Sequence, residues 1–364
     1  MHVATSPEVD NVVQQAFYVI FGVAGVVTNG VVIITILLNR TLYRKTYGLM
    51  AALAAADILT NIGLFSFGVN RLRILVSQRA SDPLTNWQCV IKLPMLLSIV
   101  GPQSAVLIIF LSASDRLLAA TYTMQWYKGD HGKRYSALVI ACFGVGFGSY
   151  LSSFYSISAI GTRETLLAAV CSFSETFPLD MLLFYFVTQT VAGWASVLIA
   201  YLSLFFIKCR SLDAGLSQAQ IRQQLELTHC LVISISVSFL LWFLPATALA
   251  LGYTTEADHA NLSAFTPYLW MLIELRSVLN MFIYFWQDKA LRDGAQVQLC
   301  REQIDSDVSA RQKWPRDRRR NKRIRHHSTR ERGQKNMDGR RRSETVQLTQ
   351  STTSCYDELM DDHV

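Results

Sequence analysis

The sequence is poor in charge and lacks the residue patterns that mark common enzyme active sites. Only 17% of its 364 residues are charged, whereas a soluble domain usually carries about 25%. It contains no metal-ligand spacing, nucleophile triad, phosphate-binding glycine loop or internal repeat, so we expect no enzyme, no cofactor and no bound metal. The first residues also lack the basic segment and cleavage site of a secretory signal peptide.

Hydrophobic residues, by contrast, make up 51% of the chain. They occur in long runs, and about 20 mostly apolar residues suffice to cross a bilayer. The runs lack the two-residue alternation of barrel strands, so each is predicted to be a helix. The predicted fold is therefore all-α, a seven-transmembrane helix bundle. The predicted spans are residues 12–38, 47–70, 89–122, 135–160, 179–207, 225–251 and 266–286.

Basic residues and cysteines predict how the bundle is oriented. One set of loops is richer in Lys and Arg, and nearly half of the 34 basic residues follow Leu299. Because cytoplasmic loops are the more basic ones, we expect a plasma-membrane protein with its N-terminus outside and its C-terminus in the cytosol. Cys89 and Cys171 then face the oxidising side and are predicted to form a disulfide. Two free thiols are the alternative.

Five short motifs occur in matching order along these spans. They are GVVTNGVVI with Asn29, LAAAD with Asp57, the pair Asp115-Arg116, FLLWFLP with Phe239 and Pro245, and NMFIY with Asn280 and Tyr284. Together they resemble the rhodopsin-like G-protein-coupled receptors over about residues 12–300. The stretches GPQSAVLIIFLSASDRLLA and LNMFIYFWQDKALRD are similar to the Srsx-type serpentine chemoreceptors of nematodes.

This resemblance implies a receptor that binds an extracellular small molecule or short peptide and activates a cytosolic heterotrimeric G protein. Asp115 would hold Arg116 in the inactive state by a charge-assisted hydrogen bond, and outward movement of the sixth helix would free Arg116. Tyr201 and Tyr284 are expected to join this switch. Their position at a helix end also fits an alternative, in which the charged groups of Asp115 and Arg116 extend to the water at the membrane surface.

Within the receptor class, a chemosensory function is the leading prediction and a neuropeptide receptor is the second. A seven-span channel or transporter is a third class. Transporters tend to show inverted repeats and a path of charged residues, and the sequence shows neither.

Three ionisable residues fall well inside the predicted spans. A charge at mid-bilayer costs roughly 2.5–3.5 kcal/mol or more, so each should face the bundle interior. Asp57 resembles the family's central polar group, near Asn29 and Asn280, where many receptors hold sodium. Arg276 precedes Asn280 by one helical turn, so we expect it to reach Asp57 and replace the ion. Bonding of Arg276 to backbone carbonyls elsewhere is the alternative.

The third such residue, Glu274, occupies the place of the retinal-bearing lysine of opsins. The seventh span contains no lysine, which excludes a Schiff-base photoreceptor. Ser98 stands where amine receptors carry an acid. Glu274 could anchor a cationic ligand or be a structural acid bonded to a neighbouring helix. The candidate pocket residues are Ser98, Gln103, Phe243, Tyr268, Trp270 and Glu274.

The sequence departs from the family pattern at four helices, of which the fourth contains no tryptophan. Met281 replaces the proline after Asn280, which puts the usual kink of the seventh helix in doubt. Phe243 occupies the expected tryptophan position, with Trp242 one residue earlier. Gly193 stands where the fifth helix usually has a proline.

The sequence predicts that the chain is divided into four segments. Residues 1–11 form a short extracellular N-terminus, 12–286 the receptor domain, 287–300 an amphipathic helix on the membrane, and 301–364 a disordered basic cytosolic tail. The tail is expected to contact anionic lipid rather than nucleic acid and, once phosphorylated, arrestin. Asn261 is a glycosylation candidate and Cys300 a palmitoylation candidate. The last residues also fit a PDZ ligand.

Overall fold

The computed structural model describes residues 12–39, 45–77, 83–122, 132–159, 166–168, 171, 173–210, 218–254, 259–287 and 291–292. Seven helices in this part of the chain are long and apolar enough to cross a membrane, which confirms the predicted all-α bundle of a multi-pass membrane protein. The spans are α1 (Val12–Leu38), α2 (Lys45–Val76), α4 (Leu93–Thr121), α6 (Gly132–Ala159), α8 (Leu179–Arg210), the compound sixth span and α11 (His259–Gln287). The sixth span joins α9 (Gln218–Ser238), η2 (Phe239–Phe243) and α10 (Leu244–Thr254).

The bundle places apolar side chains outside and polar ones inside, as a bilayer requires. Ile20, Ile140 and Leu198 are each more than 60% exposed, on three different helices. Asp57 and Arg276, by contrast, are at most 1% exposed. Exposed apolar side chains over several helices fit lipid, and intramembrane charges face the interior because lipid cannot solvate them.

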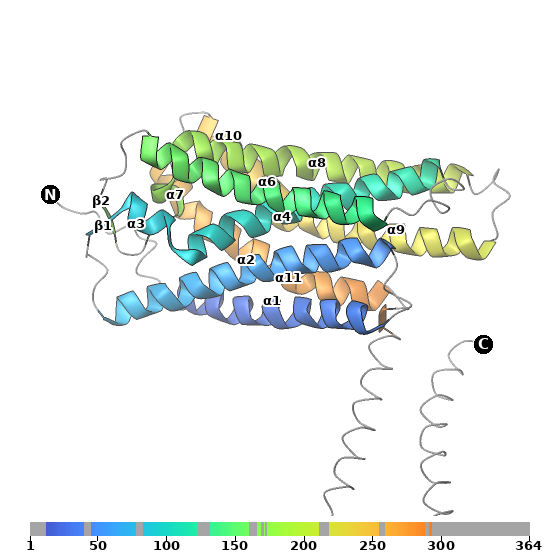
Figure 1. The fold of residues 1–364 in the computed structure, drawn as a ribbon, viewed down its shortest axis with the longest axis horizontal. Helices are drawn as coiled ribbons and strands as arrows, with labels where there is room; N and C mark the ends of the chain where they lie inside the picture. The colour runs from blue at the N-terminus through green and yellow to red at the C-terminus, as the bar shows by residue number, and fades with distance from the viewer. Residues whose placement is uncertain are drawn as a thin grey trace, which may run out of the picture. The chain divides into compact units, whose positions relative to one another are not determined.

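One end of the bundle is closed by short elements and a disulfide, and we call it the disulfide end. Figure 1 shows β1 (Pro83–Thr85), β2 (Leu166–Ala168), α3 (Asn86–Val90) and α7 (Phe173–Thr176) gathered there. The strands pair antiparallel. The predicted disulfide joins Cys89 of α3 to Cys171, with their Cα atoms 5.5 Å apart. The opposite end, where α4 finishes just beyond Arg116, is called the Arg116 end.

The third predicted span is not continuous, which corrects the expectation of one helix over residues 89–122. The short helix α3 ends at Val90, and α4 begins at Leu93 with Lys92 as its N-cap. Pro94 lies in the first turn of α4. Proline has no N–H to bond to a preceding turn, so it starts a helix well but does not continue one.

A second proline shapes the interior of the same helix. Pro102 lies in the middle of α4 and donates no hydrogen bond to the carbonyl four residues earlier, which belongs to Ser98. The Tyr185 hydroxyl of α8 donates to that carbonyl at 3.4 Å. Pro102 therefore leaves the Ser98 carbonyl free to accept the bond that links α4 to α8.

The sixth span contains a π-helical turn, η2, which ends two residues before Pro245. The Leu244 N–H donates to the carbonyl of Phe239, five residues back. Pro245 cannot make the normal bond to the preceding turn, and π turns of this kind are frequent at functional sites. The seventh span shows no such interruption, since α11 runs as α-helix past Met281.

Several predicted features lie outside the described residues. These are the N-terminal segment, Cys300 and the tail after residue 300. Of the predicted amphipathic helix only Gln287, Leu291 and Arg292 are described, and Asn261 lies in α11 with its side chain outside the described part.

Candidate functional site

The centre of the bundle is held by an ion pair between two helices. The guanidinium of Arg276 on α11 contacts the carboxylate of Asp57 on α2. The second carboxylate oxygen of Asp57 accepts a hydrogen bond from Asn280 Nδ2 at 3.3 Å. The structure thus brings these residues together as their spacing predicted, and the buried charges neutralise each other.

Asn280 extends this pair towards the sixth span. Its side-chain oxygen accepts a hydrogen bond from the Ser234 hydroxyl of α9 at 3.0 Å. Ser234 lies one turn from Cys230, and Asn280 lies one turn from Tyr284. Since Cys230 and Tyr284 both line a cavity at the Arg116 end, the central pair is connected to within one turn of that cavity.

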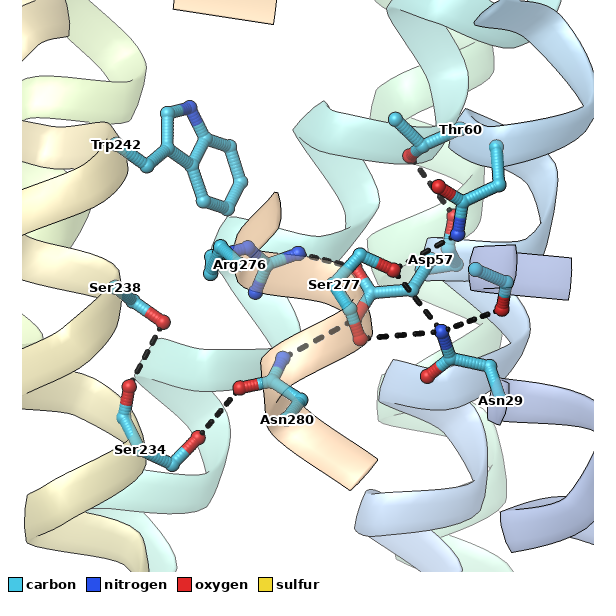
Figure 2. A network of polar contacts seen from close by, with 12 residues as sticks. Asn29, Asp57, Thr60, Ser234, Ser238, Trp242, Arg276, Ser277 and Asn280 are labelled. Atoms are coloured by element: carbon cyan, nitrogen blue, oxygen red, sulfur yellow. Dashed lines mark hydrogen bonds and ion pairs between the residues drawn. The ribbon is translucent and has the colours of Figure 1, made fainter. Parts of the chain in front are cut away.

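A cluster of amide groups fixes α1 and α2 to α11 (Figure 2). Ser277 Oγ accepts from Asn29 Nδ2 at 2.9 Å and from Asn61 Nδ2 at 2.8 Å. Asn29 also donates to the carbonyl of Gly25, a residue without a side chain that would otherwise overlap Asn61. These bonds set the height and rotation of α11, and so position Arg276 beside Asp57.

The guanidinium of Arg276 has a second contact, with the sixth span. Its Cζ atom lies 4.7 Å from the centroid of the Trp242 ring, on η2, and Figure 2 shows the two side chains facing each other. Such a cation–π contact is worth about 2 kcal/mol or more when desolvated. Trp242 Nε1 in turn donates to Gln189 Oε1 of α8 at 2.7 Å. A single chain of contacts therefore joins α2, α11, η2 and α8.

The residues around Asp57 do not fit a resident sodium ion of the kind found in many rhodopsin-like receptors. A sodium ion needs several free oxygen ligands, as hard cations do. Here one carboxylate oxygen is taken by Arg276 and the other accepts from Asn280. A second cation would also meet the positive guanidinium of Arg276.

Phe243, the residue at the usual tryptophan position, packs against the backbone of α8. A Cβ atom added to Gly193 would lie 2.6 and 2.8 Å from the two Cδ atoms of this ring. Only glycine leaves room for such an approach. The close approach of the Phe243 ring thus explains why residue 193 is a glycine.

The Arg116 end holds the second charged pair. Arg116 Nε donates to Asp115 Oδ2 at 3.1 Å, with a further bond from Nη2. The other oxygen of Asp115 accepts from the Tyr135 hydroxyl of α6. Both charged residues are less than 10% exposed, so they are not a pair extended into solvent.

A cavity lies beside this pair. Its lining comes from α2, α4, α9 and α11, the helices on either side of the Asp115–Arg116 pair. Leu49, Met50, Leu53, Ser112, Asp115, Arg116, Leu227, Cys230, Leu231 and Tyr284 line it. Tyr284 thus shares a cavity with Arg116. Tyr201 does not line it, because its side chain is about half exposed and bonds to Ser236 at 3.2 Å.

The six candidate pocket residues do not form one group. Gln103 and Glu274 are fully buried with no hydrogen-bond partner for their side chains in the described part of the chain. Trp270 is buried among aromatic rings, and the Ser98 hydroxyl is bonded to the carbonyl of Met95 within its own helix. Tyr268 is 56% exposed, which corrects its assignment to a buried pocket.

Several residues of the network were not selected from the sequence. Asn61 follows Asp57 by four residues, and Ser277 precedes Asn280 by three, so helical periodicity could have found both. Gln189 carries a weaker signal, as an amide inside an apolar run. Tyr135 carries none, because nothing in the sequence indicates that it meets Asp115.

Comparison with known proteins adds one match. The family model described as "serpentine type 7TM GPCR chemoreceptor Srsx" matches residues 22–298. A search of curated proteins found no match.

Proposed function

The chain belongs to the Srsx family of serpentine type 7TM GPCR chemoreceptors, and we therefore propose that it detects an external small molecule or short peptide and activates a heterotrimeric G protein. In this proposal the disulfide end faces outwards and receives the ligand. The Arg116 end faces the cytosol and contacts the G protein. The protein acts in the plasma membrane, where its disulfide lies on the oxidising side.

The observation that carries this proposal is the chain of contacts through the bundle core. Gln189 lies one turn from Tyr185, which packs in an aromatic cluster towards the disulfide end. From Gln189 the contacts run through Trp242 and Arg276 to Asp57. A ligand that shifts α8 or the sixth span would disturb these contacts, and a ligand can shift an equilibrium only through such differential contacts.

Arg116 is proposed to be the residue that contacts the G protein when the receptor is active. In this structure Asp115 holds its guanidinium, and Tyr135 holds Asp115. Leu227, Cys230 and Leu231 of α9 line the cavity beside this pair. Movement of α9 away from α4 would enlarge the cavity and expose Arg116 to the G protein.

The test is G-protein recruitment in cells that express the full chain, measured with a panel of odorants and peptides. We expect at least one stimulus to recruit a G protein, and Arg116→Ala to abolish the response at equal surface expression. Arg73→Ala is the matched control, since Arg73 is an exposed arginine on α2. Unchanged signalling by Arg116→Ala would remove this residue from the mechanism.

The same panel separates the other classes of function. A response confined to peptides would identify a neuropeptide receptor. Ligand-evoked current without any G protein would identify a channel. Epitope tags that place both chain ends in one compartment would contradict the proposed orientation.

A further inference from the structure

Glu274 is a buried acid that the network described above does not use. Its side chain is 0% exposed, and neither carboxylate oxygen has a hydrogen-bond partner among the described residues. Arg276 is only two residues away, but it is paired with Asp57, and residues two apart lie on different faces of a helix. Arg276 therefore pairs with Asp57, and no described residue forms an ion pair with Glu274.

Such an isolated carboxylate is costly and calls for a functional explanation. Burying an ionised group without a partner is among the most unfavourable arrangements in a protein. Ionisable residues inside a membrane bundle commonly mark ligand or ion sites. A positively charged ligand would give Glu274 the partner that the described residues do not supply.

An aromatic cluster lies one helical turn from Glu274, on the side of the disulfide end. Trp270 precedes Glu274 by four residues on α11, so the two share one face at a rise of about 6 Å. The Trp270 ring lies 5.3 Å from Phe173 of α7 and 6.3 Å from Tyr185 of α8, between centroids. Phe173 and Tyr185 are 5.5 Å apart, which completes a three-ring cluster.

An acid one helical turn from a cluster of three aromatic rings is a combination that can recognise ammonium groups. Aromatic faces attract cations within about 6 Å of the ring centroid, and cages of such rings bind quaternary ammonium ligands. The Tyr185 hydroxyl is already bonded to the Ser98 carbonyl, which fixes its ring in the cluster. Ser98 itself carries no charge, so Glu274 is the acid on which an amine would depend.

We propose that Glu274, with Trp270, Phe173 and Tyr185, binds the ammonium group of a small organic cation. This inference rests on the proposed receptor function and names its ligand class. The carboxylate supplies the charge, and the rings supply a surface for the methyl or methylene groups next to the nitrogen. Neutral and anionic molecules of the same shape are rejected because they leave the carboxylate unpaired.

The test measures binding to the purified full-length receptor and, separately, G-protein activation in cells. Two pairs of probes differ in charge at constant shape. They are choline with its carbon isostere dimethylbutanol, and phenethylammonium with phenylethanol. Glu274→Gln removes the charge at constant size, and Glu274→Asp keeps the charge on a shorter side chain. Asp180→Asn is the control, since Asp180 is an exposed acid in the first turn of α8.

We expect an ammonium probe to bind the wild type and its neutral isostere to bind about 30-fold more weakly or worse. Glu274→Gln should lose affinity by a similar factor, Glu274→Asp should retain part of it, and Asp180→Asn should match the wild type. Equal binding by Glu274→Gln, equal binding of the isosteres, or no binding of either ammonium probe at millimolar concentration would overturn the proposal and leave Glu274 a structural acid. Ammonium binding without G-protein activation would contradict the proposed coupling but not the site.

Discussion

Replacement of Asp57 by asparagine is the most direct test of the central ion pair. Asp57 and Arg276 are each about 1% exposed, so neither can reach water if its partner is lost. Removing one member of a buried pair typically costs about 3–5 kcal/mol, because the other charge stays buried and unpaired. Asp57→Asn should therefore shift the equilibrium between folded and unfolded receptor by roughly two to four orders of magnitude.

A double-mutant cycle separates this effect from simple loss of packing. Arg276→Met should also destabilise, since Asp57 would keep only its bond from Asn280, and the stack on Trp242 would lose its cation. The double variant Asp57→Asn, Arg276→Met leaves neither position of this pair charged and should recover much of the loss. We expect a coupling energy of about 2 kcal/mol or more between the two sites.

The assay is the thermal stability of the purified receptor, with surface expression and signalling measured in parallel. Asp180→Asn is again a suitable control, because it removes an exposed acid. Two results would refute the reasoning. One is full stability, expression and signalling of Asp57→Asn, and the other is additive loss in the double variant.

Four further predictions follow from separate contacts. Tyr135→Phe removes the hydroxyl that holds Asp115, so basal G-protein output should rise about fivefold for a lost bond of about 1 kcal/mol; no rise would show that the bond does not restrain the switch. Gly193→Ala forces a Cβ into the Phe243 ring and should lower stability by about 1–3 kcal/mol in a thermal assay; unchanged stability would contradict the tight fit of the ring against α8. Cys171→Ser should cost about 2–5 kcal/mol, and reductant should destabilise the wild type but not this variant. Exchange of sodium for potassium in the medium should leave ligand potency unchanged. A strong sodium dependence would contradict the inference that Arg276, and not a sodium ion, neutralises Asp57.

The main lines of the fold were predictable because a bilayer imposes simple rules. Spans need long apolar runs and charges must face inwards, so seven helices and the position of Asp57 follow from the sequence. The contact of Arg276 with Asp57 was predictable as well, since one helical turn separates Arg276 from Asn280. The disulfide between Cys89 and Cys171 followed from which cysteines fall on one side of the membrane.

Other features depended on contacts between helices that no local pattern encodes. The break at Lys92 was missed because hydropathy continues across it, although Pro94 marks the new start. The stacking of Trp242 on Arg276 depends on the extra residue in η2, which rotates the ring into the core. Tyr201 and Tyr268 were assigned inwards by analogy, but the rotation of their helices exposes both.

The π turn at Phe239–Phe243 has a mechanical consequence for the sixth span. A π turn accommodates one residue more than an α turn, and each residue advances an α-helix by about 100°. If η2 relaxed into regular α-helix, α9 would rotate about the helix axis relative to α10 by about that amount. Cys230 and Leu227 would then turn away from Arg116, with the backbone bonds of both sections left intact.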